Sequence, residues 1–318
     1  MFDRSRQSAG SHSFSPQSSC ESEEPCLCCA AIQRARELSA FDSLPEWGSP
    51  LTPGVQLVNL SHNADGSLLR VDLSQDWPRM FEQLPLVGPG LVMTRNEAAI
   101  LGQRMYYPRL DLESDGVLQI DFSLLGAARA VHLRRETGHI FGVEFYDPAG
   151  HTIHRFTTTP RSDLDAFFDW VRLHQACGDT VARPCAESMG STAPEPVSIL
   201  RTTDPGALVS VFTACGQRQL PIRATVHAGA IVQQTHFVPV SLQSIDGWWF
   251  ASDDIAGIHF HTDQFTGLDL AVSTDPTRPH LQLRAHTETC EPALVLEPGV
   301  DANGEVTAAW HDLLHSFA

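Results

Sequence analysis

The sequence contains no lysine, and all 21 of its basic residues are arginines. The absence of lysine excludes Schiff-base catalysis and the phosphate-binding lysine of a P-loop. Positive charge is also scarce, because 38 acidic residues leave a formal net charge of −17. Binding to nucleic acid needs a basic footprint that neutralises phosphates. We therefore expect no nucleic-acid partner.

Long apolar runs are absent as well. No stretch approaches the roughly 20 apolar residues that span a bilayer, and the start MFDRSRQSAGSHSFS lacks the apolar core of a secretory signal. The motifs G-x-S-x-G and H-E-x-x-H and a glycine-rich phosphate loop are also missing. We expect a cytoplasmic protein without membrane insertion and without a common hydrolase motif.

Half of the eight cysteines crowd into the segment CESEEPCLCC, as Cys20, Cys26, Cys28 and Cys29. The cluster lacks the two C-x2-C pairs of a structural zinc site, since only Cys26 and Cys29 have that spacing. A metal or redox role stays open beside the simpler interpretation of thiols on a flexible tail. The surrounding residues 1–30 are rich in Ser, Gln and Glu, a composition that predicts disorder.

The first half contains a block of four short segments that are β-branched or aromatic and punctuated by Gly, Asp and Pro: VLQIDFSLL, AVHLRR, IFGVEFYD and TIHRFTTT. This pattern predicts antiparallel strands joined by hairpin turns. The block ends in SDLDAFFDWVRLHQA (162–176), which predicts an amphipathic helix with Ser162 as its N-cap. The apolar stripe of this helix is Leu164, Phe167, Phe168 and Val171.

A Pro-, Ser- and Gly-rich stretch at 177–200 predicts a linker, and after it the order of elements recurs. VHAGAIVQQTHFVPV resembles TRNEAAILGQRMYYP, GWWFASDDIAGIHFHTD resembles SDGVLQIDFSLL, and EVTAAWHDLLHSF repeats the closing helix. Such recurrence indicates a tandem duplication. We predict an α+β protein of two similar lobes, 31–176 and 201–318, each a large antiparallel β-sheet with packed helices.

The stretch GPGLVMTRNEAAILG interrupts an apolar segment with a polar cluster, Thr94, Arg95, Asn96 and Glu97. One interpretation is a tight turn between core elements, in which Arg95 pairs with a carboxylate. The other is a family signature. Together with LQIDFSLL, VEFYDPAGHTIHRF and the helix at 162–176, the stretch resembles the haemin-degrading factor family, the HemS-, HmuS- and ChuX-like proteins of bacterial haem utilisation. Weaker second-half matches are GAIVQQTHFVPV, GIHFHTD and VTAAWHDLL.

The resemblance implies two α+β lobes that bind haem in the cleft between them, for transfer to a partner protein or for iron release. It also implies a possible haem-degrading activity. The family's axial histidine aligns with Gly206, however, and its distal arginine aligns with Ser123. Both usual ligand side chains are therefore missing, and the question of an enzymatic activity stays open.

Histidines of the second half are candidate replacements for the lost ligand. His259 and His261 are two residues apart in GIHFHTD, so on a strand they point the same way and could bind one metal. The resemblance places His259 at a family histidine and His261 at a family arginine. His227 and His236 complete the predicted cofactor-binding cluster, and His154 matches a family histidine in the first half. The simpler alternatives are histidines packed or solvated on a sheet, and a buried hydrogen bond for His154.

Three functions are compatible with these residues. The first is haem binding. The second is a diverged non-haem binding or regulatory module that kept the fold and lost the ligands. The third is a divalent-metal site in which a carboxylate such as Asp263 joins His259 and His261.

Overall fold

The computed structural model describes residues 70–108, 117–135, 138–176, 198–202, 204–273, 280–288, 292–299 and 304–316. The predicted tail at 1–30, with Cys20, Cys26, Cys28 and Cys29, lies outside these ranges, as does most of the predicted linker at 177–200. The tail, the linker and the lobe boundaries stay predictions. Among the described residues, Cys215 is a buried free thiol.

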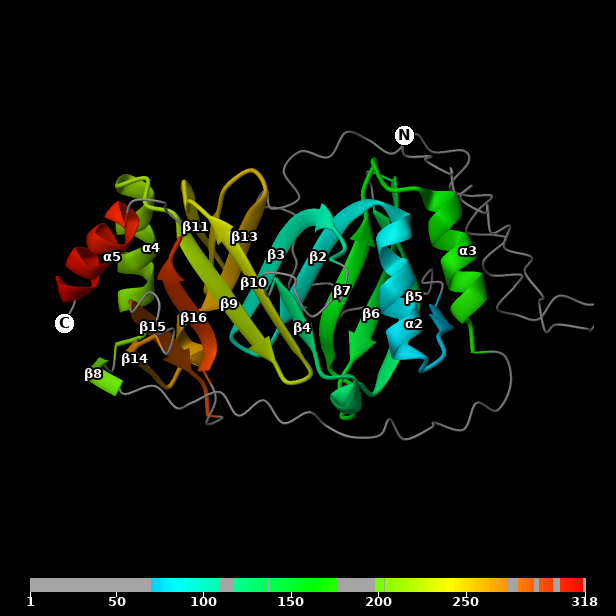
Figure 1. Cartoon of the computed structure of the whole chain (residues 1–318), viewed down its shortest axis with the longest axis horizontal. Helices are drawn as coiled ribbons and strands as arrows, with labels where there is room; N and C mark the ends of the chain where they lie inside the picture. Colours follow the sequence, from blue (N-terminus) through cyan, green and yellow to red (C-terminus); the bar gives the residue numbers. More distant parts are fainter. Residues whose placement is uncertain are drawn as a thin grey trace, which may run out of the picture.

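Two antiparallel sheets form the body of the molecule (Figure 1). The nine-stranded sheet has the order β1-β5-β6-β7-β2-β3-β13-β12-β11, and the seven-stranded sheet has the order β4-β10-β9-β16-β15-β14-β8. The strands of the first half are β1 (Arg70–Asp72), β2 (Pro89–Arg95), β3 (Ala99–Tyr106), β4 (Leu118–Ile120), β5 (Ala127–Arg135), β6 (Gly138–Tyr146) and β7 (Thr152–Thr158). Those of the second half are β8 (Ser198–Thr202), β9 (Ile222–Ala228), β10 (Ile231–Phe237), β11 (Ser241–Ile245), β12 (Trp248–Ser252), β13 (Ala256–His261), β14 (Gly267–Val272), β15 (Leu281–His286) and β16 (Pro292–Pro298).

The two halves use the same strand order. The first half contributes β1-β5-β6-β7-β2-β3 to its sheet, and the second half contributes β8-β14-β15-β16-β9-β10 to the other. Each series closes with a helix, α3 (Leu164–His174) and α5 (Glu305–His315). This repeated order confirms the predicted α+β architecture of two large antiparallel sheets with packed helices.

The halves also exchange strands. The first half gives β4 to the seven-stranded sheet, and the second half gives β13, β12 and β11 to the nine-stranded sheet. β4 of the first half pairs with β10, with Ile120 opposite Ile231. In the same way β13 of the second half pairs with β3, with Ile258 opposite Leu101. A short 3-10 turn follows both β4 and β13, η3 (Phe122–Leu124) after β4 and η4 (Thr262–Gln264) after β13. Each sheet therefore extends across the predicted boundary between the lobes.

Helices cover one face of each sheet. The first half places α2 (Trp77–Gln83), the 3-10 helix η2 (Leu84–Val87) and α3 on one core cluster, where the Trp170 indole Nε1–H donates to the Met80 carbonyl at 3.1 Å. The second half places α4 (Ala207–Gln217) and α5 on a second cluster. No described helix has the length and apolar character needed to cross a bilayer.

The N-cap of α3 differs from the residue that the sequence predicted. The N-cap is Asp163, whose carboxylate accepts a hydrogen bond from the Ala166 backbone N–H at 2.9 Å. Ser162, the predicted cap, instead donates its hydroxyl to the Pro89 carbonyl at 2.5 Å. Both residue types cap helices well, and the tertiary contact with β2 engages Ser162 elsewhere.

Strand alternation gives each sheet an inner and an outer face. The inner faces pack against the helices and against each other, and they bury Val92 and Phe156 of the first half with Ile231 of the second. Leu91 and Met93 point to the opposite, outer face of the nine-stranded sheet, in a separate cluster whose described members all come from strands.

Candidate functional site

One cross-strand row on the outer face of the nine-stranded sheet contains a predicted site residue. Arg95 lies opposite Ile100, Ile100 opposite His259, and His259 opposite Phe250. Residues directly opposite each other in an antiparallel sheet point to the same face. The row therefore presents an arginine, two apolar side chains and an imidazole side by side.

A cluster of buried apolar side chains surrounds this row. Leu91, Met93, Ile100 and Phe250 are each buried and form a cluster, with Trp248 packed against it. We call these five residues the outer cluster. Its aromatic and aliphatic side chains are of the kind that line sites for flat hydrophobic ligands.

His259 stands on the outer cluster with a free nitrogen. Its ring stacks on Phe250 with the centroids 4.3 Å apart, and its Nε2 is buried without a hydrogen-bond partner. Burial lowers the pKa of His259 to about 4, so the imidazole is neutral at physiological pH. A neutral imidazole with an unbonded nitrogen is the form that ligates a metal.

His261 lies beside it on the same face, as predicted for residues two apart on a strand. Its ring meets Trp248 edge-on at 5.5 Å, and its Nδ1 is buried without a partner. Gly247, with φ of +83°, leaves room for the ring, because a Cβ at that position would lie 2.9 Å from the His261 Nε2. The turn between β11 and β12 thus needs glycine both for its left-handed backbone and for the imidazole above it.

The other two predicted histidines of the second half lie on the other sheet. His227 on β9 and His236 on β10 share the outer face of the seven-stranded sheet. Their positions are four residues apart along the strands, or about 14 Å. Burial and the nearby Arg223 lower the pKa of His236, against an opposing effect of Glu297. The four histidines are therefore divided between two sheets and do not form one cluster.

His154 lies on the inner face of the nine-stranded sheet, and both of its ring nitrogens have partners. Nδ1 is 2.7 Å from the Thr94 hydroxyl, and Nε2 is 2.9 Å from the Tyr107 hydroxyl. Burial lowers its pKa to about 3. This arrangement matches the alternative interpretation, a buried structural hydrogen bond, and leaves no ring nitrogen for a ligand.

The polar cluster at the end of β2 is a turn, and Asn96 fastens it to the second half. The Asn96 side-chain oxygen accepts from the backbone N–H groups of Ala98 and Ala99, at 3.0 and 2.8 Å. Its amide group donates to the carbonyls of His227 and Ala293, both at 2.8 Å. Arg95 does not pair with a carboxylate as one interpretation expected, because its guanidinium has no hydrogen bond or ion pair with any described residue.

The positions that align with the family's haem ligands offer no side chain to iron. Gly206 is the N-cap of α4, and its backbone N–H donates to the Asp204 carboxylate at 2.8 Å. The Ser123 hydroxyl donates to the Asp121 carboxylate at 2.6 Å. Any protein ligand to haem iron in this chain must therefore come from elsewhere.

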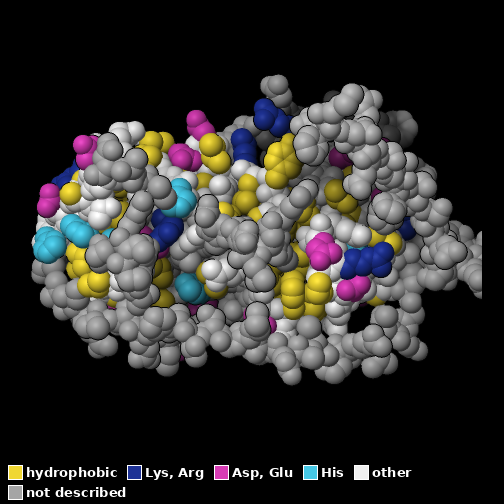
Figure 2. Space-filling model, viewed as in Figure 1, with side chains coloured by type: hydrophobic (Ala, Val, Ile, Leu, Met, Phe, Trp, Pro, Cys, Tyr) yellow, Lys and Arg dark blue, Asp and Glu magenta, His cyan; other side chains and the backbone are white. Residues whose placement is uncertain are grey.

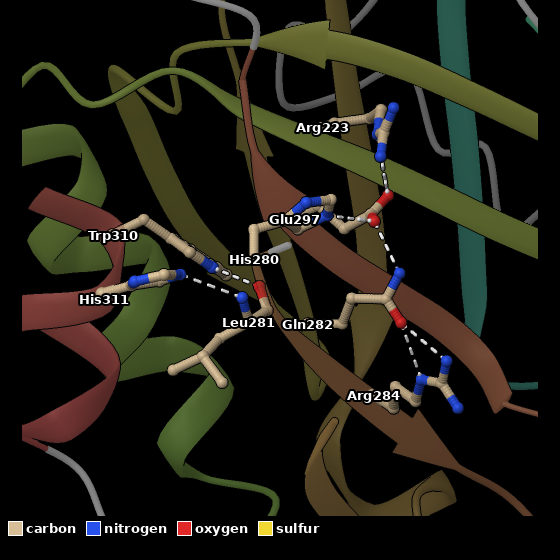
Figure 3. A network of polar contacts seen from close by, with 8 residues as sticks. All are labelled: Arg223, His280, Leu281, Gln282, Arg284, Glu297, Trp310 and His311. Atoms are coloured by element: carbon tan, nitrogen blue, oxygen red, sulfur yellow. Dashed lines mark hydrogen bonds and ion pairs between the residues drawn. The ribbon is translucent and has the colours of Figure 1, made fainter. Parts of the chain in front are cut away.

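A polar network occupies the outer face of the seven-stranded sheet (Figure 3). It was not predicted from the sequence. The buried Glu297 carboxylate accepts from Arg223 at 2.7 Å, from His280 at 2.7 Å and from Gln282 at 2.6 Å. Gln282 in turn accepts from the Arg284 guanidinium at 2.6 Å. The alternation in HLQLRAH could have indicated this polar face, but not the carboxylate on the neighbouring strand. Figure 2 shows histidine side chains over the second half of the molecule, whereas arginine and acidic side chains lie over both halves.

Metal ligands do not converge in the described part of the chain. No group of three or more His, Cys, Asp or Glu residues there has the geometry to hold an ion. Asp263, proposed to join His259 and His261, completes no such group. The divalent-metal alternative therefore lacks a third ligand among these residues.

Comparison with known proteins identifies the class of fold. No family model matches the chain, and no curated protein matches its sequence. Solved structures do match. One is holo-PhuS, a haem-binding protein from Pseudomonas aeruginosa, with a TM-score of 0.66 and 17% identity over 78% of this chain and 87% of PhuS. Another is ChuS, a haem-degrading enzyme from Escherichia coli O157:H7, with a TM-score of 0.67 and 13% identity over 90% of this chain and 98% of ChuS.

The chain thus has the tandem α+β fold of bacterial haem-utilisation proteins. The resemblance predicted from TRNE, IDF and the closing helices is confirmed at the level of fold, in a strongly diverged sequence.

Proposed function

We propose that this protein binds haem on the outer face of the nine-stranded sheet, with His259 as the iron ligand. The observation that carries the proposal is the buried, unpartnered Nε2 of a neutral imidazole on an apolar cluster. An unsatisfied buried nitrogen costs about 1–3 kcal/mol, and a bond to iron would remove that cost.

The outer cluster supports the same ligand. Phe250, Trp248 and Ile100 flank the imidazole and would contact the flat apolar macrocycle. His261, with its own unpartnered Nδ1, is the second candidate for the iron. The bound haem would be transferred to a partner protein, or it would be a source of iron in the cytoplasm.

This proposal differs from the inter-lobe cleft that the resemblance implies. The inner faces of the sheets bury core side chains against each other, and the family ligand positions hold Gly206 and Ser123. The outer face combines an imidazole that has an unpartnered nitrogen with a cluster of apolar side chains. This combination fits an iron porphyrin better than the inner faces do.

The test is a titration of the purified protein with haemin. We expect a sharp Soret band that saturates at equal amounts of haemin and protein, and a shift in that band in His259→Ala. A titration without saturation would contradict haem binding and favour the alternative of a non-haem binding or regulatory module. Parallel titrations with Zn²⁺, Ni²⁺ and Co²⁺ test the metal alternative, for which we expect no stoichiometric binding.

A further inference from the structure

We infer that Arg95 binds a carboxylate of the porphyrin ligand and thereby selects for an acidic macrocycle. The inference rests on the proposed haem function and adds to it a specificity-determining residue. It also gives a role to the charged residue that interrupts the apolar stretch LVMTRNEAAIL.

The first argument is the missing partner of Arg95. The side chain is partly buried, its pKa is lowered by desolvation, and it has no hydrogen bond or ion pair with the described residues. A partly desolvated guanidinium without a counter-charge is unfavourable. Its neighbour Glu97 is exposed and forms no ion pair with it. A ligand carboxylate would satisfy the guanidinium, whose planar donors match a carboxylate in two parallel hydrogen bonds.

The second argument is position. Arg95 and His259 belong to the same cross-strand row, with Ile100 between them. Their backbones are two strand spacings apart, or about 10 Å. A haem macrocycle is wider than one strand spacing and carries its carboxylates at one edge. One such ligand can therefore contact the imidazole, Ile100 and the arginine together.

The third argument is the rigid support of Arg95. Asn96 fixes the turn directly after it, with side-chain hydrogen bonds to both halves of the protein. The neighbouring arginine on the same face, Arg155, is already paired with the buried Glu144. The backbone next to Arg95 is thus fixed and its guanidinium has no described partner, whereas the charge of Arg155 is compensated by Glu144.

The experiment compares three probes that differ in charge and in iron. Haemin has iron and two carboxylates, haemin dimethyl ester has iron without the acids, and protoporphyrin IX has the acids without iron. Binding is measured by Soret absorbance for the iron compounds and by tryptophan fluorescence quenching for protoporphyrin IX. Four proteins are used: the unmodified chain, Arg95→Gln, Arg95→Lys, and the exposed control Arg161→Gln.

We expect Arg95→Gln to weaken the binding of haemin and of protoporphyrin IX by about tenfold or more, as the loss of one charge-assisted hydrogen bond predicts. Its affinity for the dimethyl ester should equal that of the unmodified protein. Arg95→Lys should recover part of the loss, because it keeps the charge without the bidentate geometry. Arg161→Gln should bind all three probes as the unmodified protein does, and thermal melts should be alike for all four.

The outcomes separate this inference from the proposed function. If the ratio of the haemin affinity to the dimethyl ester affinity is the same in Arg95→Gln as in the unmodified protein, the inference is wrong, even when haemin binds. If Arg95→Gln weakens protoporphyrin IX while His259→Ala leaves the Soret band unchanged, the carboxylate site stands and the proposed iron ligand is wrong. If the unmodified protein binds none of the three probes, both fail.

Discussion

The Thr94 hydroxyl on β2 donates a hydrogen bond to the side-chain oxygen of Gln233 on β10, at 2.7 Å, between the two sheets. Because this hydroxyl proton is committed to Gln233, Thr94 must accept from His154 Nδ1–H. His154 Nε2 then accepts from the Tyr107 hydroxyl. The four side chains form one directed chain across the core, and each member is buried.

Removing the Thr94 hydroxyl should break this chain. Thr94→Val leaves a buried oxygen on Gln233 and a buried N–H on His154 unpaired, so we expect a loss of about 2 kcal/mol in the free energy of unfolding. Urea denaturation measures it. The control is Thr213→Val, on the exposed face of α4, which should change stability by less than about 0.5 kcal/mol.

A double-mutant cycle with Gln233→Leu isolates the link between the halves. The two substitutions should interact by about 1 kcal/mol, because each removes the partner of the other. Strict additivity would show that the Thr94–Gln233 bond contributes nothing beyond packing.

The buried His154 should make stability depend on pH. Its pKa is about 3 in the folded protein, against the ordinary histidine value of 6.5 in the unfolded chain. A depressed pKa favours folding above pH 6.5, and this contribution falls as the pH drops from 6.5 towards 3, by about 1.4 kcal/mol per pH unit.

We expect His154→Gln to be less stable at pH 7 but to lose stability more slowly between pH 6 and 4. Equilibrium unfolding at a series of pH values measures the slope. Thr213→Val, an exposed change on α4 that removes no titratable group, should keep the slope of the unmodified protein. An equal slope in His154→Gln would mean that His154 is protonated in the folded state.

Glu297 should be needed for the stability of the seven-stranded sheet. Burial alone would raise its pKa, but the hydrogen bond from His280 and the charge of Arg223 outweigh this effect and lower it. Glu297→Gln leaves Arg223 without its counter-charge, and we expect a loss of about 3 kcal/mol. Glu288→Gln, an exposed neighbour beyond β15, should change little. Thermal melts of the two variants measure this difference. Equal melting temperatures for Glu297→Gln and Glu288→Gln would mean that solvent replaces the Glu297 carboxylate without loss of stability.

Substitution of the four second-half histidines tests the iron ligand directly. We expect His259→Ala to shift the Soret maximum and to lower the affinity for haemin more than tenfold. His261→Ala should have a smaller effect on both. His227→Ala and His236→Ala should behave as the unmodified protein does, because they lie on the other sheet. A wild-type spectrum in all four variants would exclude this set of ligands.

The pH dependence of haemin binding gives an independent check. With a pKa of about 4 for His259, the ligating neutral form dominates above pH 5. Binding through His259 should therefore be constant from pH 6 to 8 and fall as the pH approaches 4. Stopping each titration before the protein unfolds, as judged by circular dichroism, keeps the two effects apart.

Several features of this protein follow from local sequence pattern. Alternation in GIHFHTD predicted a strand with His259 and His261 on one face, and β13 has this arrangement. The amphipathic stripe at 162–176 predicted α3 and its buried Phe167 and Phe168. The recurrence of elements predicted the duplicated fold. The first two depend on the periodicity of a single strand or helix, which is visible in the spacing of apolar residues. The third depends on the order in which such segments recur.

Tertiary structure decided which sheet each strand joins. A strand's alternation defines its two faces but not its neighbours, so nothing in LQI or AGIHFH indicated that β4 and β13 would exchange between the halves. That exchange places His259 in a row with Arg95 and separates it from His227 and His236. The free nitrogen of His259 and the unpaired charge of Arg95 follow from contacts between strands more than 150 residues apart, which pairing energies set only in the folded chain.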